Sequence, residues 1–244
     1  MKIAVITPVY KEEKKIIERC NISVLKQNIK CDHIIVQDGD YQFNLKNLKA
    51  EIFRSSISND NGNAPRSIGT DYAIQNEYDY IAYLDADNFF HEKHIDNLLN
   101  KIQNFDVSTC FRTFHKENGE KINIMEDDDA LNKQHVDTSC YLISKKIFHY
   151  INIWKEIPKE VSQWCDRIFF NYLLHKKTNI KFTDAYTVSF TTLYENHYKR
   201  GGEKVPNNAK KFSINQKAIN YFLTKKKSDE FYKKFGFTFF PPTI

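Results

Sequence analysis

The sequence lacks the long hydrophobic run that a membrane-spanning helix requires, because no stretch approaches about 18 consecutive apolar residues. The N-terminal stretch, MKIAVITPVYKEE, holds a short apolar run without the small residues of a cleavage site. We therefore interpret this run as a first β-strand rather than a signal peptide. The expected location is cytoplasmic, at the inner face of the membrane if the C-terminal segment contacts lipid.

Closely spaced cysteine pairs are also missing. The five cysteines (Cys20, Cys31, Cys110, Cys140 and Cys165) include no C-x-x-C pair, and their number is odd. A disulfide framework and a structural zinc site are therefore not expected. We predict that these cysteines are buried as small apolar side chains in a protein of a reducing compartment.

Basic and acidic residues are unevenly distributed. Eleven of the 36 basic residues but only three of the 31 acidic residues lie between Lys199 and Ile244. The net charge of +5 thus divides into +8 for this segment and −3 for the first 198 residues. An acidic body with a basic, aromatic tail is not typical of a nucleic-acid-binding domain, so no nucleic-acid partner is expected.

Strand-like and helix-like patterns alternate through the first 105 residues. The predicted strands cover 2–6, 33–36, 51–54 and 80–84, and the predicted helices cover 12–26, 63–75 and 92–103. Asn63 is the expected cap of the second helix. This alternation predicts βαβ units around a mostly parallel, Rossmann-like sheet, with ligands beyond the carboxyl ends of the strands.

The second half of the chain is less regular. Its predicted elements are strands over 107–114, 121–125 and 140–143, a helix over 162–174, a mobile loop over 191–208 and a helical segment over 209–234. We divide the chain into one domain, residues 1–205, with halves at 1–105 and 106–205. A basic, aromatic helical extension, residues 206–244, follows it.

The sequence Asp85-Ala86-Asp87 directly follows the apolar run 80–84. In an extended segment residues i and i+2 point to the same side, so the two carboxylates converge at the end of a strand. Like charges that close need a cation, a proton or a basic partner. A hard divalent ion such as Mg²⁺ or Mn²⁺ takes oxygen ligands of this kind. A solvated acidic turn is the alternative interpretation.

Five ordered segments stand at ordinary separations along the chain: Ile6–Tyr10, Ile35–Gly39, Asn63–Gly69, Tyr83–Asp87 and Gln163–Arg167. Together they resemble family 2 of the glycosyltransferases, whose nucleotide-binding fold is called GT-A. The resemblance implies a GT-A fold in which the first half, 1–105, binds the nucleotide and the second half, 106–205, binds the acceptor. It also implies a metal-dependent, inverting enzyme that uses a nucleotide-sugar donor.

The resemblance assigns the site of the nucleotide base to the ends of the first two strands. Thr7, Pro8 and Tyr10 lie in the segment that is similar to the family's base-packing loop. Asp38 matches the family's base-binding aspartate. Many members carry a second acidic residue just before it, where this chain has Gln37.

The resemblance also assigns the metal and diphosphate. Asp85, Ala86 and Asp87 match the family's metal-binding motif, with Mn²⁺ or Mg²⁺ as the implied ion. Arg66, at a helix start, is expected to face the phosphates together with helix N–H groups. His197 is a further candidate ligand of the metal or diphosphate, on a loop expected to close over the donor. A surface histidine without such a role is the alternative.

For the acceptor side, Asp166 is similar to the family's catalytic base, which removes the proton of the attacking hydroxyl. Many members carry a Glu just before it, where this chain has Cys165. His135, Asp137 and Cys140 precede a predicted strand and are candidates for the lining of the acceptor site or for structural roles.

The basic tail has two interpretations. Its alternating lysines and aromatic residues favour either packing against the domain with solvated lysines, or contact with an anionic membrane that carries a lipid-linked acceptor. The sequence leaves both open.

The function predicted from these observations is the inverting transfer of a sugar to a glycan hydroxyl. The expected donor is a UDP-sugar, and the expected acceptor is a bacterial surface polysaccharide or lipopolysaccharide, by analogy alone. A nucleotidyltransferase on a similar fold is one alternative, but it needs a glycine-rich loop after the first strand, and the segment Thr7–Lys11 has no glycine. A non-catalytic glycan- or nucleic-acid-binding protein that uses the basic tail is the other.

Overall fold

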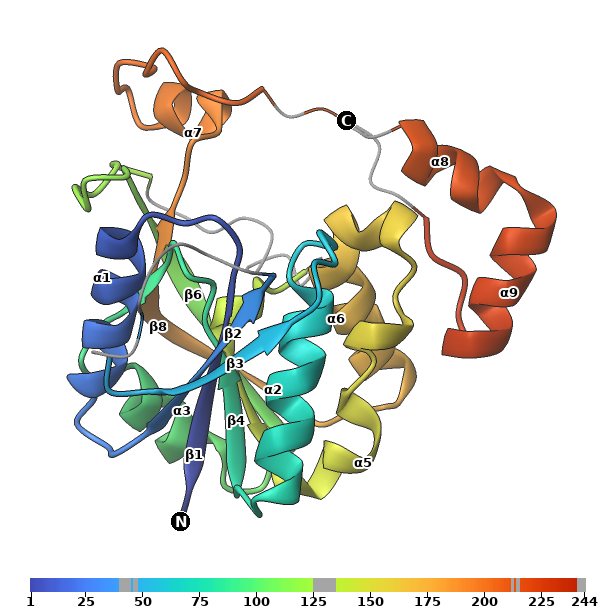
Figure 1. Ribbon diagram of the computed structural model, residues 1–244, viewed down its shortest axis with the longest axis horizontal. Coiled ribbons are helices and arrows are strands. Elements are labelled where there is room, and N and C mark those ends of the chain that lie inside the picture. Colours follow the sequence, from blue (N-terminus) through green and yellow to red (C-terminus); the bar gives the residue numbers. More distant parts are fainter. Residues whose placement is uncertain (40–44, 46–47, 125–134, 212, 214–215, 241–244) are drawn as a thin grey trace.

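The computed structural model describes residues 1–39, 45, 48–124, 135–211, 213 and 216–240. These residues form a central eight-stranded sheet with helices on both faces (Figure 1). The predicted α/β class is confirmed.

The first half of the chain supplies the parallel part of the sheet. Its strands are β1 (Ile3–Val9), β2 (Asp32–Asp38), β3 (Glu51–Ser55) and β4 (Tyr80–Tyr83). β1 pairs in parallel with β2 and β4, and β2 pairs in parallel with β3. Each strand matches a predicted one. β1 is buried along its whole length, as expected for a strand covered on both faces.

Helices connect these strands. α1 (Lys14–Leu25) joins β1 to β2, α2 (Asn63–Gln75) joins β3 to β4, and α3 (His94–Ile102) follows β4. α1 and α3 lie on one side of the sheet and α2 lies on the other (Figure 1). Because β1, β2 and β4 are parallel, their carboxyl ends meet at one edge of the sheet, and the polar segments after them are brought together there.

The second half completes a mixed sheet. Its strands are β5 (Phe89–Phe90), β6 (Val107–His115), β7 (Tyr141–Ser144) and β8 (Ile180–Thr191). The order across the sheet is β3-β2-β1-β4-β7-β6-β8-β5. β7 is antiparallel to β4 and β6, whereas β6 and β8 are parallel.

The predicted strand over 121–125 is wrong for its described residues, 121–124, while Met125 lies outside them. Lys121 makes only an isolated bridge to His115. The two isoleucines of the segment pack in a small apolar cluster with Phe114. Burial, rather than ladder pairing, therefore explains the alternation of apolar residues.

The predicted mobile loop over 191–208 is also wrong in part. Residue 191 ends β8, and residues Glu195–Arg200 form the helix α7. Tyr198 of this helix is buried, and its hydroxyl donates to the carbonyl of Thr192. The helix carries too few apolar residues to show a periodic pattern, so the sequence predicts only a loop.

Two further helices and four short 3₁₀ helices belong to the described part of the second half of the chain. α5 spans Phe148–Ile151 and α6 spans Cys165–His175. Short 3₁₀ helices occupy Thr138–Cys140 (η2), Lys145–Ile147 (η3), Trp154–Glu156 (η4) and Lys159–Trp164 (η5). The predicted helix over 162–174 corresponds to the end of η5 and α6. The rings of Trp154 and Phe169 stack 4.4 Å apart against Tyr83, which ties α6 to the sheet.

Two helices form the described part of the tail, α8 (Gln216–Leu223) and α9 (Lys225–Phe235), and they lie beside α6 (Figure 1). Phe231, Phe235 and Phe239 are buried in the main apolar core. Lys227 and Lys234 form ion pairs with glutamates of the domain. Packing against the domain is thus confirmed for α8 and α9, whereas the predicted helix over 209–234 is wrong for residues 209–211, which are not helical. None of the helices among the described residues is both long enough and apolar enough to span a bilayer.

Replacing Phe231 with alanine tests this packing. Phe231 is 2% exposed, so Phe231→Ala is expected to lower the free energy of unfolding by about 3–5 kcal/mol through loss of burial and creation of a cavity. Urea denaturation followed by circular dichroism measures the change. Tyr232, its neighbour on α9, is 55% exposed, and Tyr232→Ala is the matched control, expected to change the free energy by less than about 0.5 kcal/mol. Equal effects of the two variants would contradict the packing.

Candidate active site

A cleft of about 520 Å³ opens at the carboxyl edge of the parallel strands. Eight of the residues that the sequence predicts for the site line it. They are Pro8, Tyr10, Asp38, Arg66, Asp85, Ala86, Asp87 and Asp166. These residues come from β1, the loop after it, β2, the segment after β4, α2 and α6. They share one cavity although 158 positions separate Pro8 from Asp166.

Two predicted residues are not brought into this lining. Thr7 is fully buried behind the cleft, where its hydroxyl lies 2.8 Å from Nε2 of His33. His197 on α7 places Nδ1 2.7 Å from the hydroxyl of Thr192, and its ring packs on Phe114. In the described part of the chain, His197 does not lie in the cleft with the carboxylates as expected. Its role as a ligand of the metal or diphosphate stays a prediction.

Arg66 and Asp85 form the central ion pair of the cleft. Nη2 of Arg66 lies 2.5 Å from Oδ1 of Asp85, and Nη1 donates to the carbonyl of Asn61 at 2.7 Å. Burial opposes the charge of Arg66, but the carboxylate of Asp85 outweighs it and raises the pKa of the guanidinium above its ordinary value. Arg66 therefore keeps a permanent positive charge beside the first aspartate of the Asp-Ala-Asp motif.

Gly62 allows the N-terminus of α2 to lie close to the Arg66–Asp85 ion pair. Gly62, not Asn63 as predicted, is the N-cap residue, and it adopts a left-handed conformation with φ of +81°. A Cβ atom at this position would lie 3.0 Å from Cβ of Pro8 and 3.1 Å from Nη1 of Arg66. A glycine here therefore lets the start of the helix approach the loop after β1 closely.

The carboxyl groups of Asp87 and Glu12 form no ion pair with a basic side chain of the described residues. The side chain of Asp87 is accessible to solvent, but protein atoms of the cleft surround its carboxyl group and Asp85 lies beside it. This desolvation, reinforced by the charges of Asp85 and Glu12, raises the pKa of Asp87 to about 7. Desolvation likewise raises the pKa of Glu12 to about 7, with a smaller contribution from Asp85.

This excess of negative charge fits a divalent cation. Carboxylate oxygens are the ligands that Mg²⁺ and Mn²⁺ prefer, and such ions commonly use one or two carboxylates together with phosphate oxygens of a substrate. The described residues contain no group of three or more candidate ligands. An ion held by Asp87 and Asp85 would therefore need further oxygen ligands from a bound diphosphate or from water.

Asp38 is buried at the end of β2 and holds the loop after β3. Its Oδ1 accepts from the backbone N–H of Ser58 at 2.7 Å, and its Oδ2 accepts from that of Asn59 at 2.8 Å. Asn59 also lines the cleft. Oδ1 also accepts from the hydroxyl of Ser55 on β3 at 3.3 Å, so Asp38 fixes the backbone on this side of the cleft.

Asp166 lies in the first turn of α6, with its side chain 29% exposed toward the cleft. Its Oδ2 is 3.0 Å from Nε2 of His135, and its Oδ1 accepts from the backbone N–H of Arg167 at 2.7 Å. Burial alone would raise the pKa of Asp166, but the interactions with His135 and Arg167 outweigh it and lower that pKa. The group is therefore ionised at neutral pH and able to accept a proton.

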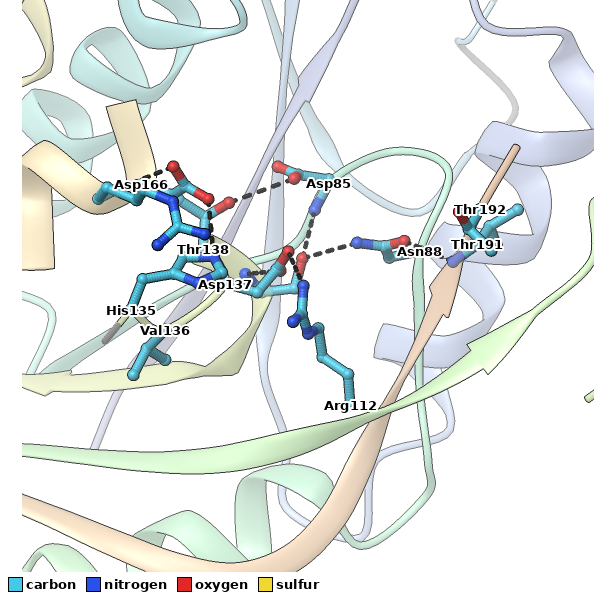
Figure 2. Close-up of polar contacts among 12 residues, drawn as sticks. Asp85, Asn88, Arg112, His135, Val136, Asp137, Thr138, Asp166, Thr191 and Thr192 are labelled. Atoms are coloured by element: carbon cyan, nitrogen blue, oxygen red, sulfur yellow. Dashed lines mark hydrogen bonds and ion pairs between the residues drawn. The ribbon is translucent and has the colours of Figure 1, made fainter. Parts of the chain in front are cut away.

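Residues His135–Ser139, which we call the His135–Ser139 segment, connect several parts of the cleft (Figure 2). The hydroxyl of Thr138 donates to Oδ2 of Asp85 at 3.2 Å. The backbone N–H of Asp85 and the amide of Asn88 both donate to the hydroxyl of Ser139. The sequence predicts no such network, and its only signal is the group of polar residues before β7.

The same network connects the cleft to β6 and β8 in the second half of the sheet. Nη1 of Arg112 on β6 lies 3.4 Å from Oδ2 of Asp137, and Oδ1 of Asn88 accepts from the backbone N–H of Thr191 on β8. Asp137 lines the cleft, as the sequence suggests for the acceptor side. Cys140 is buried in the core and belongs to the packing instead.

Comparisons with known proteins agree with this geometry. A sequence model described as glycosyl transferase family 2 matches residues 4–159. The matched range includes the Asp-Ala-Asp motif and ends before Asp166, so the position of Asp166 rests on the fold. No curated protein sequence matches the chain.

The similar solved structures include three of S. aureus TarS. The crystal structure of residues 1–349 has a TM-score of 0.61 and 17% identity, covering 78% of this chain and 60% of TarS 1–349. Its complex with UDP has a TM-score of 0.62 and 16% identity, covering 82% and 63%. Its complex with UDP-GlcNAc has a TM-score of 0.63 and 14% identity, covering 98% and 74%. The chain thus spans 60% of the first of these structures. At this level of identity the similarity shows only the fold, which is the predicted GT-A fold.

The raised pKa values of Asp87 and Glu12 predict how stability depends on pH without a cation. Both groups have ordinary pKa values near 4 and values of about 7 in the folded state, so the folded protein binds more protons than the unfolded chain between these limits. Stability is then highest below about pH 4 for these two groups and falls as pH rises to about 7. Asp87→Asn should flatten this fall in thermal melts recorded with EDTA.

The control for this variant is Asp184→Asn, at an exposed aspartate of β8 that does not line the cleft. It should leave the slope of melting temperature against pH unchanged. A slope that is the same in the wild type and in Asp87→Asn would show that Asp87 is not destabilised by its neighbours.

Proposed function

The chain belongs to glycosyl transferase family 2, and from this membership we propose that it moves a sugar from a nucleotide-sugar donor to a hydroxyl group of a glycan acceptor. One observation carries the proposal. The cleft combines the uncompensated carboxylates of Asp87 and Glu12 with the ionised carboxylate of Asp166. The first pair suits a cation-bound diphosphate, and Asp166 suits the acceptance of a proton.

The donor half of the proposal uses the ends of β1 and β2. Pro8, Tyr10 and Asp38 line this part of the cleft, and we assign them to the nucleotide base. Asp38 anchors the loop at Asn59, so a base that bonds to Asp38 would rest against an ordered backbone. Thr7 supports this wall from behind without entering the cleft.

The diphosphate is assigned to Arg66 and the Asp85-Ala86-Asp87 motif. Asp87, with Asp85, would hold Mn²⁺ or Mg²⁺, which supplies positive charge to a leaving diphosphate. Arg66 neutralises Asp85, and the start of α2 directs backbone N–H groups toward the same region. These groups lie in place before the ligand binds, so little reorganisation is needed when the leaving group gains charge.

The transfer itself requires one base and no protein nucleophile. The acceptor oxygen forms a bond to the anomeric carbon, and the bond from that carbon to the diphosphate oxygen breaks. The electron pair leaves with the nucleoside diphosphate, and the proton of the acceptor hydroxyl passes to Asp166. A single displacement of this kind inverts the anomeric configuration.

We propose UDP as the nucleotide. Two of the similar structures are complexes of TarS with UDP and with UDP-GlcNAc, which makes a UDP-hexose or UDP-N-acetylhexosamine the first donor to test. For the acceptor we propose a bacterial surface polysaccharide or lipopolysaccharide. The exposed lysines of the tail would add a peripheral contact with an anionic membrane that presents a lipid-linked acceptor. A cytoplasmic location stays a prediction.

Nucleotide binding tests the donor half. UDP, GDP, CDP and dTDP are titrated calorimetrically into the wild type with Mn²⁺ and with EDTA. One nucleotide, expected to be UDP, should bind only with Mn²⁺, and Asp87→Ala should abolish this binding because the cation loses its main carboxylate. Asp184→Ala is the matched control and should bind as the wild type does. If the folded wild type binds none of the four with metal present, the glycosyltransferase proposal is wrong.

Turnover tests the acceptor half. Asp166→Asn removes the proton acceptor while keeping the shape of the side chain, so the rate of sugar transfer should fall by about 10²- to 10⁴-fold. The affinity for the nucleotide with Mn²⁺ should stay near that of the wild type, because Asp166 lies outside the donor half. A full rate in Asp166→Asn would place the base elsewhere.

A further inference from the structure

His135 is the side chain that contacts the proposed base most directly from another element. Its Nε2 lies 3.0 Å from Oδ2 of Asp166, although 31 positions separate the two residues. His135 is 4% exposed and does not line the cleft. It therefore contacts the base (Figure 2) without bordering the cleft in which substrates would lie.

The contacts of Asp166 fix its orientation. One oxygen faces His135, and the other accepts from the backbone N–H of Arg167. Two donors on different oxygens restrict rotation of the carboxylate about its side-chain bonds. One lone pair on each oxygen is left for a hydroxyl that approaches from the cleft.

The position of His135 is itself fixed by the His135–Ser139 segment. All five residues of this segment are at most 7% exposed. The hydroxyl of Tyr141 donates to the carbonyl of Val136 at 3.3 Å. The carboxylate of Asp137 accepts from the backbone N–H of Ser139 at 2.9 Å and lies 3.4 Å from Nη1 of Arg112. The segment cannot shift without breaking these contacts.

The same segment contacts the donor carboxylate. The hydroxyl of Thr138 donates to Oδ2 of Asp85, and that of Ser139 accepts from the backbone N–H of Asp85. A short buried stretch thus contacts the proposed base with its first residue and the metal-binding motif with its last two. The distance between proton acceptor and leaving group depends on it, and transfer rates are sensitive to such distances.

We propose that His135 is a positioning residue for Asp166, and that the His135–Ser139 segment sets the place of the proton acceptor relative to the donor carboxylates. The inference rests on the proposed function, since it concerns the transfer step described above. His135 acts through Asp166 and does not touch the reacting atoms.

The surroundings of Asp166 decide the direction of the pH effect. Six titratable or charged groups of the described residues interact electrostatically with Asp166, from its own helix and from three other segments. They are Cys165, Arg167, His135, Asp137, Tyr141 and Tyr194. Loss of His135 would leave burial and the charge of Asp137 acting on the carboxylate, so the pKa of Asp166 would rise.

The test compares two substitutions of His135, of which only one keeps a side-chain hydrogen-bond donor. His135→Phe keeps an aromatic ring and removes the hydrogen bond to Asp166, whereas His135→Gln retains a donor near the place of Nε2. His149→Gln, at an exposed histidine of α5, is the control for the substitution itself. Thermal melts establish that each variant is folded.

Turnover is followed as release of nucleoside diphosphate from UDP-, GDP-, CDP- and dTDP-sugars with Mn²⁺ and water as acceptor, from about pH 3 to pH 9, because the pKa of Asp166 lies below its ordinary value in the wild type. His135→Phe should lower the rate by about 10- to 100-fold, the range typical of removing a partner that orients a functional group. Its acid limb should move to higher pH. His135→Gln should recover most of the rate, and all variants should bind the nucleoside diphosphate with the wild-type dissociation constant.

A spectroscopic measurement checks the contact independently of turnover. The ¹⁵N resonance of Nε2 of His135, assigned with His135→Gln, should shift in Asp166→Asn. No shift would overturn the inference.

The outcomes separate the inference from the proposed function. A wild type that binds and releases none of the four nucleotides overturns both. An active wild type with an unchanged rate and an unchanged acid limb in His135→Phe overturns the positioning role alone. Equal losses in His135→Phe and His135→Gln would also overturn it, because the retained donor would then have no effect.

Discussion

The carboxylate of Asp85 is the contact on which the arrangement of the cleft depends. It follows β4 and receives the guanidinium of Arg66 from α2 on one oxygen and the hydroxyl of Thr138 on the other. The first contact joins it to the nucleotide half, and the second joins it to the segment before β7. Removing Arg66 would leave the carboxylate of Asp85 without its ion-pair partner, beside the carboxyl groups of Asp87 and Glu12, which a protein tolerates poorly.

The electrostatics of the cleft divide the acidic residues into two kinds. Asp87 and Glu12 have raised pKa values because they are desolvated beside other carboxylates. Asp166, which is also partly enclosed, has a lowered pKa because His135 and a backbone N–H stabilise its charge. Neighbouring carboxylates with opposite shifts are typical of sites with divided roles. Here the first kind suits cation binding and the second suits proton acceptance.

Much of this arrangement is predictable from the sequence. Apolar periodicity places β1, β2, β4, α1 and α2 nearly where they occur, because each buries a continuous run or a single helical face. The Asp-Ala-Asp motif follows a strand, so its place at the carboxyl edge requires only the parallel topology. The sequence also predicts Asp166 in the first turn of a helix. It does not predict the two-residue strand β5 or the helix α7, whose short runs carry no period.

The sequence by itself determined the order of β1 to β4 and of α1 to α3, the family and the residue types available for a donor site, because these depend on local pattern and on motifs a few residues long. Only the tertiary structure decided which side chains meet. His135 reaches Asp166, and Arg112 reaches Asp137, across separations that no local period encodes. Thr7 and His197 carry plausible residue types but face other partners, since the direction of a side chain follows from the packing of its element against its neighbours.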